Sequence, residues 1–161
     1  MENNFPVPAI SREFSPIEVY RQCRAPVNRR VLAALAGLVF RGEKRRPGQV
    51  NIVVVDNPEI AVLNERFLNH SGATDVLAFN YTLEDPLEGE VYVSREQAEI
   101  QSREYGVSPR NELSRLVIHG VLHLLGWRDQ TPEQRAAMQE REDYYLRQAE
   151  RRKSLQAWVT T

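Results

Sequence analysis

Residues 119–130, HGVLHLLGWRDQ, constrain this chain more than any other segment. Helical residues four apart lie on one face, so a helix through this apolar run places His119 and His123 side by side. Two imidazoles so placed are a ready pair of ligands for a transition metal. The helical pattern breaks at Gly126, and a chain that turns there can return Asp129 to both rings. We therefore predict two ligands on a helix, a glycine turn and a third ligand, Asp129.

A plainer interpretation of each residue stays open. A histidine on an apolar helix is more often a packed or surface residue than a metal ligand. Asp129 could instead cap the helix that follows. Against this, Thr131 is already suited to that cap, and two histidines at this spacing before a glycine and a carboxylate favour a metal site.

The same spacing is similar to the long zincin motif of metalloproteases. That motif has two histidines, a glycine seven residues after the first, and a third ligand at the tenth position. Position 120 is glycine here, whereas those proteases carry the glutamate that serves as general base. Peptide hydrolysis by that mechanism therefore lacks its base, and a metal-dependent peptidase is only an alternative.

Several segments, in order, resemble one known family. HGVLHLLGW resembles the signature of the YbeY-type endoribonucleases, the bacterial ribosomal RNA maturation factors, whose signature continues with Tyr-Asp-His. Leu63-Asn64 with Phe67 resembles that family's Leu-Asn segment. TDVLAF at 74–79 and GEVYVS at 89–94 resemble its Thr-Asp-Val-Leu-Ser-Phe and Gly-Asp-Ile-x-Ile-Ser segments. The resemblance extends over residues 50–146.

The resemblance implies one zinc ion per chain, held where the family has three histidines. The aligned residues here are His119, His123 and Asp129, so a carboxylate stands in for the third imidazole. His70, in a polar loop, is the fallback ligand. The family commonly carries an arginine directly after the aromatic residue at 67, and Leu68 stands there instead.

The function implied by the resemblance is a single-strand-specific, metal-dependent endoribonuclease that matures the 3′ end of small-subunit (16S) rRNA and takes part in ribosome quality control. Its partners would be RNA and the small ribosomal subunit. Candidate catalytic residues are Arg115 and Glu112, which precede His119 by four and seven residues and so lie near its face of the helix. Glu112 could equally orient an imidazole, and Arg115 could be solvated. A ribosome-associated binding factor with a structural metal is the second alternative.

Composition adds limits. The formal net charge of −1 gives no global signature of nucleic-acid binding, so RNA contacts must come from local clusters such as the loop of Arg41, Lys44, Arg45 and Arg46. Such a run is more often a solvated surface. Trp127 could stack on a base, although packing under the Gly126 turn is the commoner role.

Location follows from what the chain lacks. The single cysteine, Cys23, cannot form an internal disulfide, which fits a reducing cytosol and no disulfide-linked partner. The N-terminus shows no signal-peptide pattern, and the longest apolar run, residues 31–40, is too short to span a bilayer. We therefore expect a cytoplasmic protein with no membrane partner.

The order of periodic segments predicts an α+β fold, a small mixed sheet of about four strands packed against helices. We expect a loose segment over residues 1–15, one metal-dependent hydrolase domain over 16–150 and a C-terminal tail over 151–161. Predicted strands are centred on Ile17 and Val19 and cover 49–56, 75–81 and 88–94. Predicted helices cover 28–41, 57–67 with Asn57 as N-cap, 94–106, a fourth opened by Ser108-Pro109 that carries both histidines, and a last one opened by Thr131-Pro132.

Overall fold

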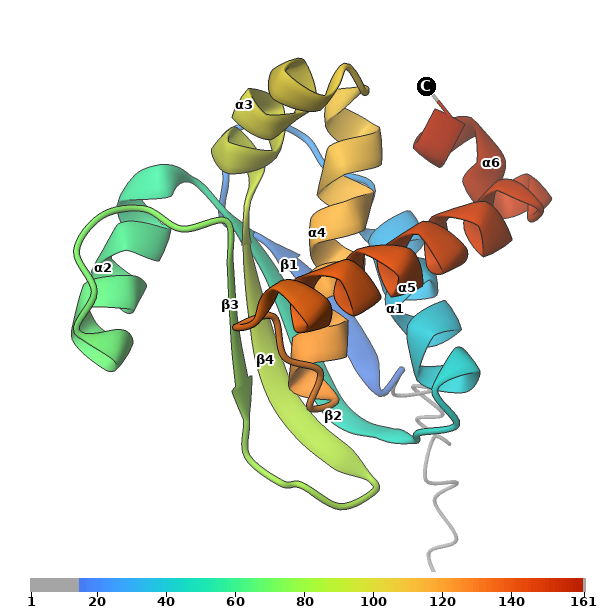
Figure 1. Ribbon diagram of the computed structural model, residues 1–161, viewed down its shortest axis with the longest axis horizontal. Helices are drawn as coiled ribbons and strands as arrows, with labels where there is room; N and C mark the ends of the chain where they lie inside the picture. Colours follow the sequence, from blue (N-terminus) through green and yellow to red (C-terminus); the bar gives the residue numbers. More distant parts are fainter. Residues whose placement is uncertain (1–14, 161) are drawn as a thin grey trace, which may run out of the picture.

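The computed structural model describes residues 15–160, which form a four-stranded mixed sheet and six helices (Figure 1). The predicted first segment, residues 1–15, lies outside the described residues except for Ser15. The α+β class with a small mixed sheet is confirmed. The strands are β1 (Ile17–Arg21), β2 (Pro47–Val55), β3 (Val76–Asn80) and β4 (Leu87–Ser94). The helices are α1 (Arg29–Gly42), α2 (Asn57–Leu68), α3 (Arg95–Tyr105), α4 (Pro109–Leu124), α5 (Pro132–Glu150) and α6 (Lys153–Thr160).

The sheet has the strand order β1-β2-β4-β3, in which β3 alone runs antiparallel to its neighbour. The side chains of β2 alternate between two hydrophobic layers, as a strand's period of two requires. Val50, Ile52 and Val54 join the main core under α1 and α4. Val53 and Val55 face a smaller cluster with Ile60 of α2. The sheet is therefore covered on both faces, with α2 alone on one side (Figure 1).

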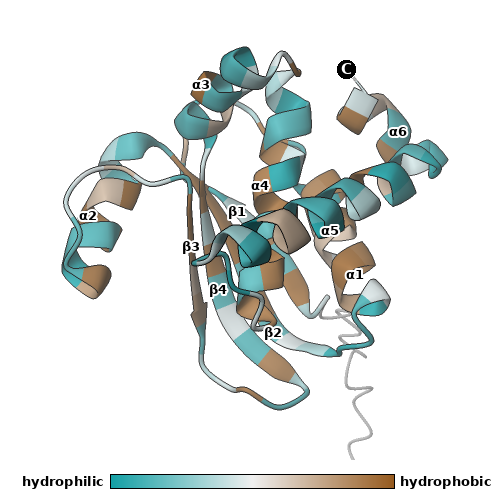
Figure 2. Ribbon diagram, in the orientation of Figure 1, coloured by the Kyte–Doolittle hydropathy of each residue, from teal (hydrophilic) through white to brown (hydrophobic). Residues whose placement is uncertain are grey.

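Helix α4 is buried along most of its length and lies directly on β3 and β4. Gly120 makes this approach possible. A Cβ at this position would lie 2.9 Å from Cγ1 of Val76 and closer still to Cγ1 of Val91. In the zincin-like motif this position carries a glutamate, for which the sheet leaves no room. In Figure 2 the hydrophobic colouring is strongest on α1 and β3, whereas α3 is mostly hydrophilic.

Two boundaries differ from the prediction for local reasons. Asp56, not Asn57, is the N-cap of α2, and Asn57 Oδ1 accepts a hydrogen bond from Ser94 Oγ instead. Strand β2 begins at Pro47, where a proline at the first position of a strand is tolerated. The cap expected at Thr131 is present, and Gln134 completes a capping box with it.

The expected C-terminal tail is instead a helix, α6, from Lys153. Its apolar residues Leu155 and Val159 are four apart and buried in the main core. The side chain of Asn111 in α4 donates a hydrogen bond to the Val159 carbonyl over 2.8 Å, which ties the helix down. Across residues 15–160, none of the helices is both long enough and apolar enough to cross a membrane.

Candidate metal centre

The last two turns of α4 carry the two histidines, and the chain reverses immediately after the helix. The N–H of Gly126 donates to the His123 carbonyl and that of Trp127 to the Leu122 carbonyl. Gly126 has a φ of 99°, in the left-handed region that favours glycine. The predicted glycine turn is thus present, and it brings Asp129 back over the end of the helix.

Three side-chain atoms converge at this end of α4. His119 Nε2 and His123 Nε2 are 2.9 Å apart, and Asp129 Oδ2 lies 3.2 Å from His123 Nε2 and 3.5 Å from His119 Nε2. Ligands of tetrahedral zinc, with bonds of about 2.0–2.1 Å, are separated by about 3.3 Å. The group can therefore hold a metal ion. Its donors, two imidazoles and one carboxylate, suit a transition metal.

Each imidazole has a partner on its other nitrogen. His123 Nδ1 lies 2.9 Å from the Trp127 carbonyl oxygen, which accepts a hydrogen bond only from a protonated Nδ1. This fixes the tautomer that leaves the Nε2 lone pair toward Asp129. His119 Nδ1 lies 3.5 Å from Oε1 of Glu142, a buried residue of α5. Both partners are of the kind that orients metal-binding histidines.

The charges around His119 favour its protonated form when no metal is present. Burial by itself lowers the pKa of His119, but the hydrogen bond and charge of Glu142, with the charges of Asp75 and Asp129, outweigh it and raise that pKa. A divalent cation would satisfy the same surplus of negative charge.

Glu43, just after α1, connects three parts of this region. Its Oε1 accepts a hydrogen bond from Trp127 Nε1 over 2.7 Å, and its Oε2 accepts from Arg141 and from Tyr145 Oη over 2.5 Å. Trp127 also packs against the main core. The structure thus supports the packing role for Trp127, and Glu43 joins the turn after α4 to the helix that carries Glu142.

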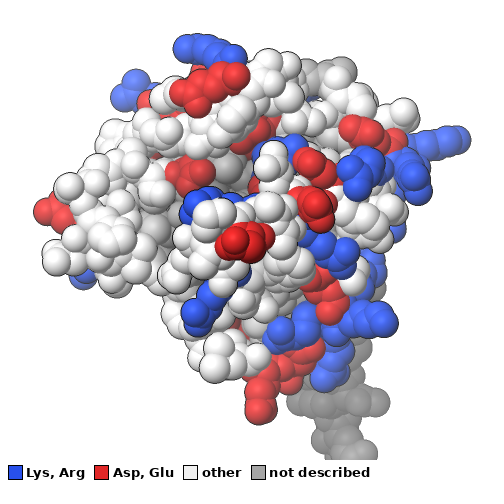
Figure 3. Space-filling model, in the orientation of Figure 1, with Lys and Arg blue, Asp and Glu red and all other residues white. Residues whose placement is uncertain are grey.

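We call His119, His123 and Asp129 the metal group. A cleft of about 580 Å³ opens beside it, between α3, α4 and α5. Figure 3 shows the hollow between α3 and α5, with acidic and basic side chains around it. Its charged lining consists of Asp75, Glu112, Asp129, Glu142, Arg115 and Arg135. The lining therefore holds more carboxyl groups than guanidinium groups, four against two.

Both candidate catalytic residues line this cleft. Arg115 forms an ion pair of 2.7 Å with Asp143 of α5. Glu112 is 1% exposed, and its Oε2 has no hydrogen-bond partner. Burial raises the pKa of Glu112, and the charges of Glu142 and Asp75 add to this effect against the opposing charge of Arg115.

Other residues singled out in the sequence lie elsewhere. His70 is exposed and is not part of the metal group. Leu68 ends α2 and is exposed. Asp75, in the TDVLAF segment, contributes to the cleft, and its Oδ2 accepts a hydrogen bond from Gln101 of α3. In the basic loop, Arg45 forms a 2.8 Å ion pair with Asp85.

The family model of the endoribonuclease YbeY matches residues 19–150. The chain belongs to the YbeY family. Endoribonuclease YbeY of Chlorobaculum parvum is 37% identical over 131 residues, which cover 81% of this chain and 93% of that protein. The protein of the same name from Rhodopirellula baltica is 42% identical over 68% of this chain and 57% of its own length. The solution structure of TM1509 from Thermotoga maritima has a TM-score of 0.56 and 28% identity, and the match covers 80% of this chain and 85% of that one.

Membership of the YbeY family confirms the resemblance drawn from the signature, and the curated relatives carry the name of an enzyme that cuts RNA. Two residues that matter to this region were missed. Glu142 lies on the apolar stripe of α5, four residues after Met138 and three before Tyr145, so its place on that stripe was an available signal. Glu43 stands within the basic loop and gave no local sign of its contacts with Trp127 and Tyr145.

Proposed function

We propose that this protein is a metal-dependent endoribonuclease that cuts single-stranded RNA, with His119, His123 and Asp129 as its metal ligands. The observation that carries the proposal is the convergence of their three donor atoms, 2.9 to 3.5 Å apart, in the signature segment of the YbeY family. Family membership supports the reaction class, and the geometry supports the metal.

The residues of the chain divide the work between them. When bound, the metal would activate water and polarise a phosphoryl oxygen. Glu142 and the Trp127 carbonyl hold the two imidazoles with Nε2 toward the metal. Arg115 and Arg135 line the cleft where a phosphate would lie, and their positive charges would stabilise the negative charge that develops on it during the reaction.

An open catalytic site fits the number of ligands better than a structural metal. Structural zinc has four protein ligands, whereas catalytic zinc has three and a fourth position for water or substrate. Within residues 15–160, the metal group holds three side chains. The position of the metalloprotease general base is Gly120, where the sheet leaves no room for a side chain. Both observations favour RNA hydrolysis over the two alternatives.

The finer proposal concerns metal, substrate and location. Zinc is the expected ion, because two imidazoles and one carboxylate are a common catalytic zinc set. Unpaired RNA at the 3′ end of small-subunit rRNA is the proposed natural substrate, with a role in ribosome quality control on the small subunit. A cytoplasmic location is supported by Cys23, the single cysteine, which is buried as a free thiol.

An end-labelled single strand of small-subunit rRNA 3′ sequence tests this proposal. Wild-type protein should cut it internally, should leave the same strand uncut when it is annealed to its complement, and should lose activity to a chelator and regain it with zinc. Substituting both ligands, His119→Ala with His123→Ala, should lower the rate by more than roughly 100-fold.

His70→Ala is the matched control, since His70 is the one histidine of the chain outside the metal group and lies in an exposed loop. It should cut RNA at the wild-type rate. Chelator-resistant cleavage, or a double histidine variant as active as wild type, would show that the metal group is not the catalytic centre.

A further inference from the structure

The candidate metal cleft offers no net positive charge to RNA, because its lining carries four carboxylates and two arginines, which a divalent cation would bring to about neutrality. The formal net charge of −1 supplies no general attraction either. The loop of Arg41, Lys44, Arg45 and Arg46 is partly neutralised by Asp85, which pairs with the Arg45 side chain and accepts a hydrogen bond from the main-chain N–H of Arg46. A polyanion therefore needs another surface.

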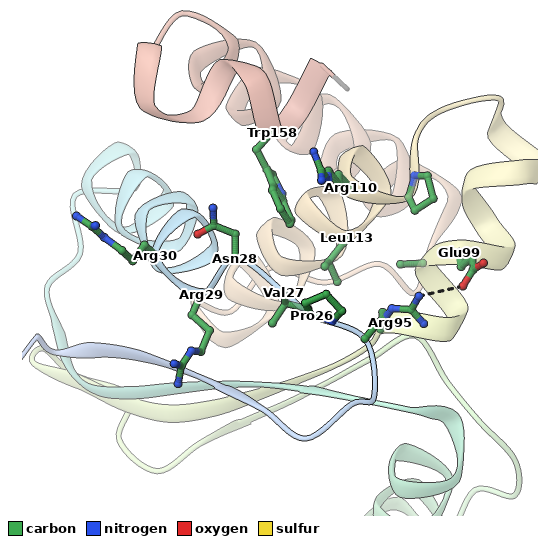
Figure 4. A pocket seen from close by; sticks show the side chains of 13 residues that line it. Pro26, Val27, Asn28, Arg29, Arg30, Arg95, Glu99, Arg110, Leu113 and Trp158 are labelled. Atoms are coloured by element: carbon green, nitrogen blue, oxygen red, sulfur yellow. Dashed lines mark ion pairs between the residues drawn. The ribbon is translucent and has the colours of Figure 1, made fainter.

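A groove of about 690 Å³ lies on the other side of α4 (Figure 4). It is lined by Arg110 and Leu113 of α4, whereas the metal cleft is lined by Glu112 and His119 of the same helix. Residues 110 and 119 are about half a turn apart around a helix. The groove and the cleft are thus separate sites on the two sides of α4.

The lining of the groove is rich in arginine. Four arginines line it against the single carboxylate of Glu99: Arg29, Arg30, Arg95 and Arg110. Glu99 forms a 3.4 Å ion pair with Arg95. Figure 4 shows Arg29 and Arg30 pointing away from Trp158 and Leu113, so their charges lie at the rim of the groove and on the surface beside it. A neighbouring depression shares Pro26, Val27 and Arg29 with the groove and adds Arg21, so the row of cations continues along the surface.

Three helices begin at this groove. Its lining includes the first residue of α1, Arg29, the first of α3, Arg95, and the first of α4, Pro109. The N-terminus of a helix carries a partial positive charge from its aligned peptide dipoles and attracts phosphate groups. The fold therefore adds to the charge of the arginines at the same place.

Trp158 of α6 supplies an aromatic wall. The guanidinium of Arg110 lies over its ring at 4.9 Å from the centroid, which holds that cation at the groove. The indole Nε1 is buried and has no hydrogen-bond partner. Ala98 and Leu113 form a buried apolar floor.

We propose that this groove is a second RNA-binding surface, which takes the phosphates of a single strand whose cut site lies at the metal cleft. A basic groove with an aromatic side chain is the usual arrangement for single-stranded nucleic acid. The inference rests on the proposed function for its substrate, but it concerns binding rather than cleavage. It gives RNA affinity to the side of α4 that carries no metal ligand.

Fluorescence anisotropy with a labelled oligouridylate, measured over a series of salt concentrations, tests the groove. The groove variant combines Arg29→Gln, Arg30→Gln and Arg110→Gln. Its affinity should fall at least about ten-fold, and its salt slope should be smaller by roughly 2, since each phosphate contact on a single strand contributes about 0.7. A control variant replaces three exposed arginines outside the groove: Arg66→Gln, Arg147→Gln and Arg152→Gln. It should bind as wild type does.

Two further measurements keep the test independent of folding. Arg110 packs on Trp158, so its loss could loosen α6; the pair Arg29→Gln and Arg30→Gln changes only exposed side chains and should still lower the affinity. In a Trp127→Phe background Trp158 is the single tryptophan, and its fluorescence should change when oligouridylate binds.

Cleavage of a short oligonucleotide that reaches only the metal cleft separates this inference from the proposed function. If the groove variant cuts it as wild type does but binds long RNA weakly, the groove is confirmed. A groove variant with wild-type affinity and salt slope overturns the inference. So does a result in which the double variant Lys44→Gln with Arg46→Gln has a smaller salt slope and the groove variant does not. Binding of oligoglutamate in place of oligouridylate would make the groove a surface for an acidic protein. A wild type that cuts no RNA while the groove variant loses affinity overturns the proposed function alone.

Discussion

Glu142 of α5 places its Oε1 3.5 Å from Nδ1 of His119 in α4, so the first proposed metal ligand is oriented by a helix that follows it in the chain. Glu142 is 7% exposed, and a carboxylate so deeply buried needs a cationic or hydrogen-bonding partner. The His119 ring is that partner. This contact makes α5 a part of the candidate metal site, although none of the three proposed ligands lies on it.

Glu142→Ala should therefore weaken metal binding although it removes no ligand. Loss of such an orienting partner lowers metal affinity by about 10- to 100-fold, and competition against a chromophoric zinc chelator measures it. The zinc affinity of Glu142→Gln should lie between those of wild type and Glu142→Ala, because the glutamine amide oxygen still accepts a hydrogen bond from Nδ1–H of His119 but carries no charge. Glu140→Ala, at an exposed position of the same helix, is the control and should bind zinc as wild type does.

Asp129→Ala should lower metal affinity by at least roughly ten-fold, about 1.4 kcal/mol, because it removes the only carboxylate of the metal group. Asp129→His should retain zinc and accept manganese or magnesium less well, since imidazole replaces an oxygen ligand. Isothermal titration with each ion distinguishes these outcomes. If Asp129→Ala binds zinc as tightly as wild type, Asp129 is not a ligand.

Gly120→Ala should destabilise the protein even though alanine favours a helix. Its Cβ would be forced against Val91 and Val76, and overpacking of this kind costs about 1–3 kcal/mol of unfolding free energy. Gly37→Ala is the matched change in α1, where a Cβ meets nothing closer than 3.4 Å; it should stabilise by about 0.5–1 kcal/mol. Urea unfolding of both variants compares them. Equal stabilities would mean that α4 lies further from the sheet.

Glu43→Gln should change how stability depends on pH. Burial raises the pKa of Glu43, but hydrogen bonds from Tyr145, Arg141 and Trp127 outweigh burial and hold that pKa below its ordinary value of 4.5. A carboxylate with a lowered folded pKa stabilises the fold above its unfolded pKa, and that contribution is lost as the pH falls through the folded value. The variant should be less stable by about 2 kcal/mol at neutral pH.

Thermal melts of both proteins from pH 7 downward measure this difference, which should shrink below about pH 4.5. Glu104→Gln, an exposed carboxylate in α3, should show no such convergence. A constant difference between wild type and Glu43→Gln at every pH would show that the charge of Glu43 contributes nothing.

What could be predicted from the sequence was local. The pairing of His119 with His123 follows from helical spacing, and the return of Asp129 follows from the turn at Gly126, all within eleven residues. Patterns of this range also located the strands and most helices. The N-cap of α2 was wrong by one residue because Asp56 and Asn57 are both good capping residues.

The remainder depends on contacts between distant residues, which no short pattern records. Glu43 meets Tyr145 across 102 positions, and the basic groove joins Arg29 to Arg110. Helix α6 was missed because its eight residues are fewer than the window of about 11–18 residues over which a helical period can be recognised. The burial of Leu155 and Val159 is visible only once α4 is in place beside them.

The sequence separation between Glu43 and its partners also determines when, during synthesis of the chain, these contacts can form. Glu43 emerges from the ribosome early, but Trp127 follows it by 84 residues and Tyr145 by 102. A growing chain released only as far as α4 would already carry both histidines, yet lack Asp129, Glu142 and the clamp of Glu43. Under the proposed function, a nascent polypeptide beside ribosomal RNA would thus be harmless to it. Cutting would begin only after α5 has left the exit tunnel and docked.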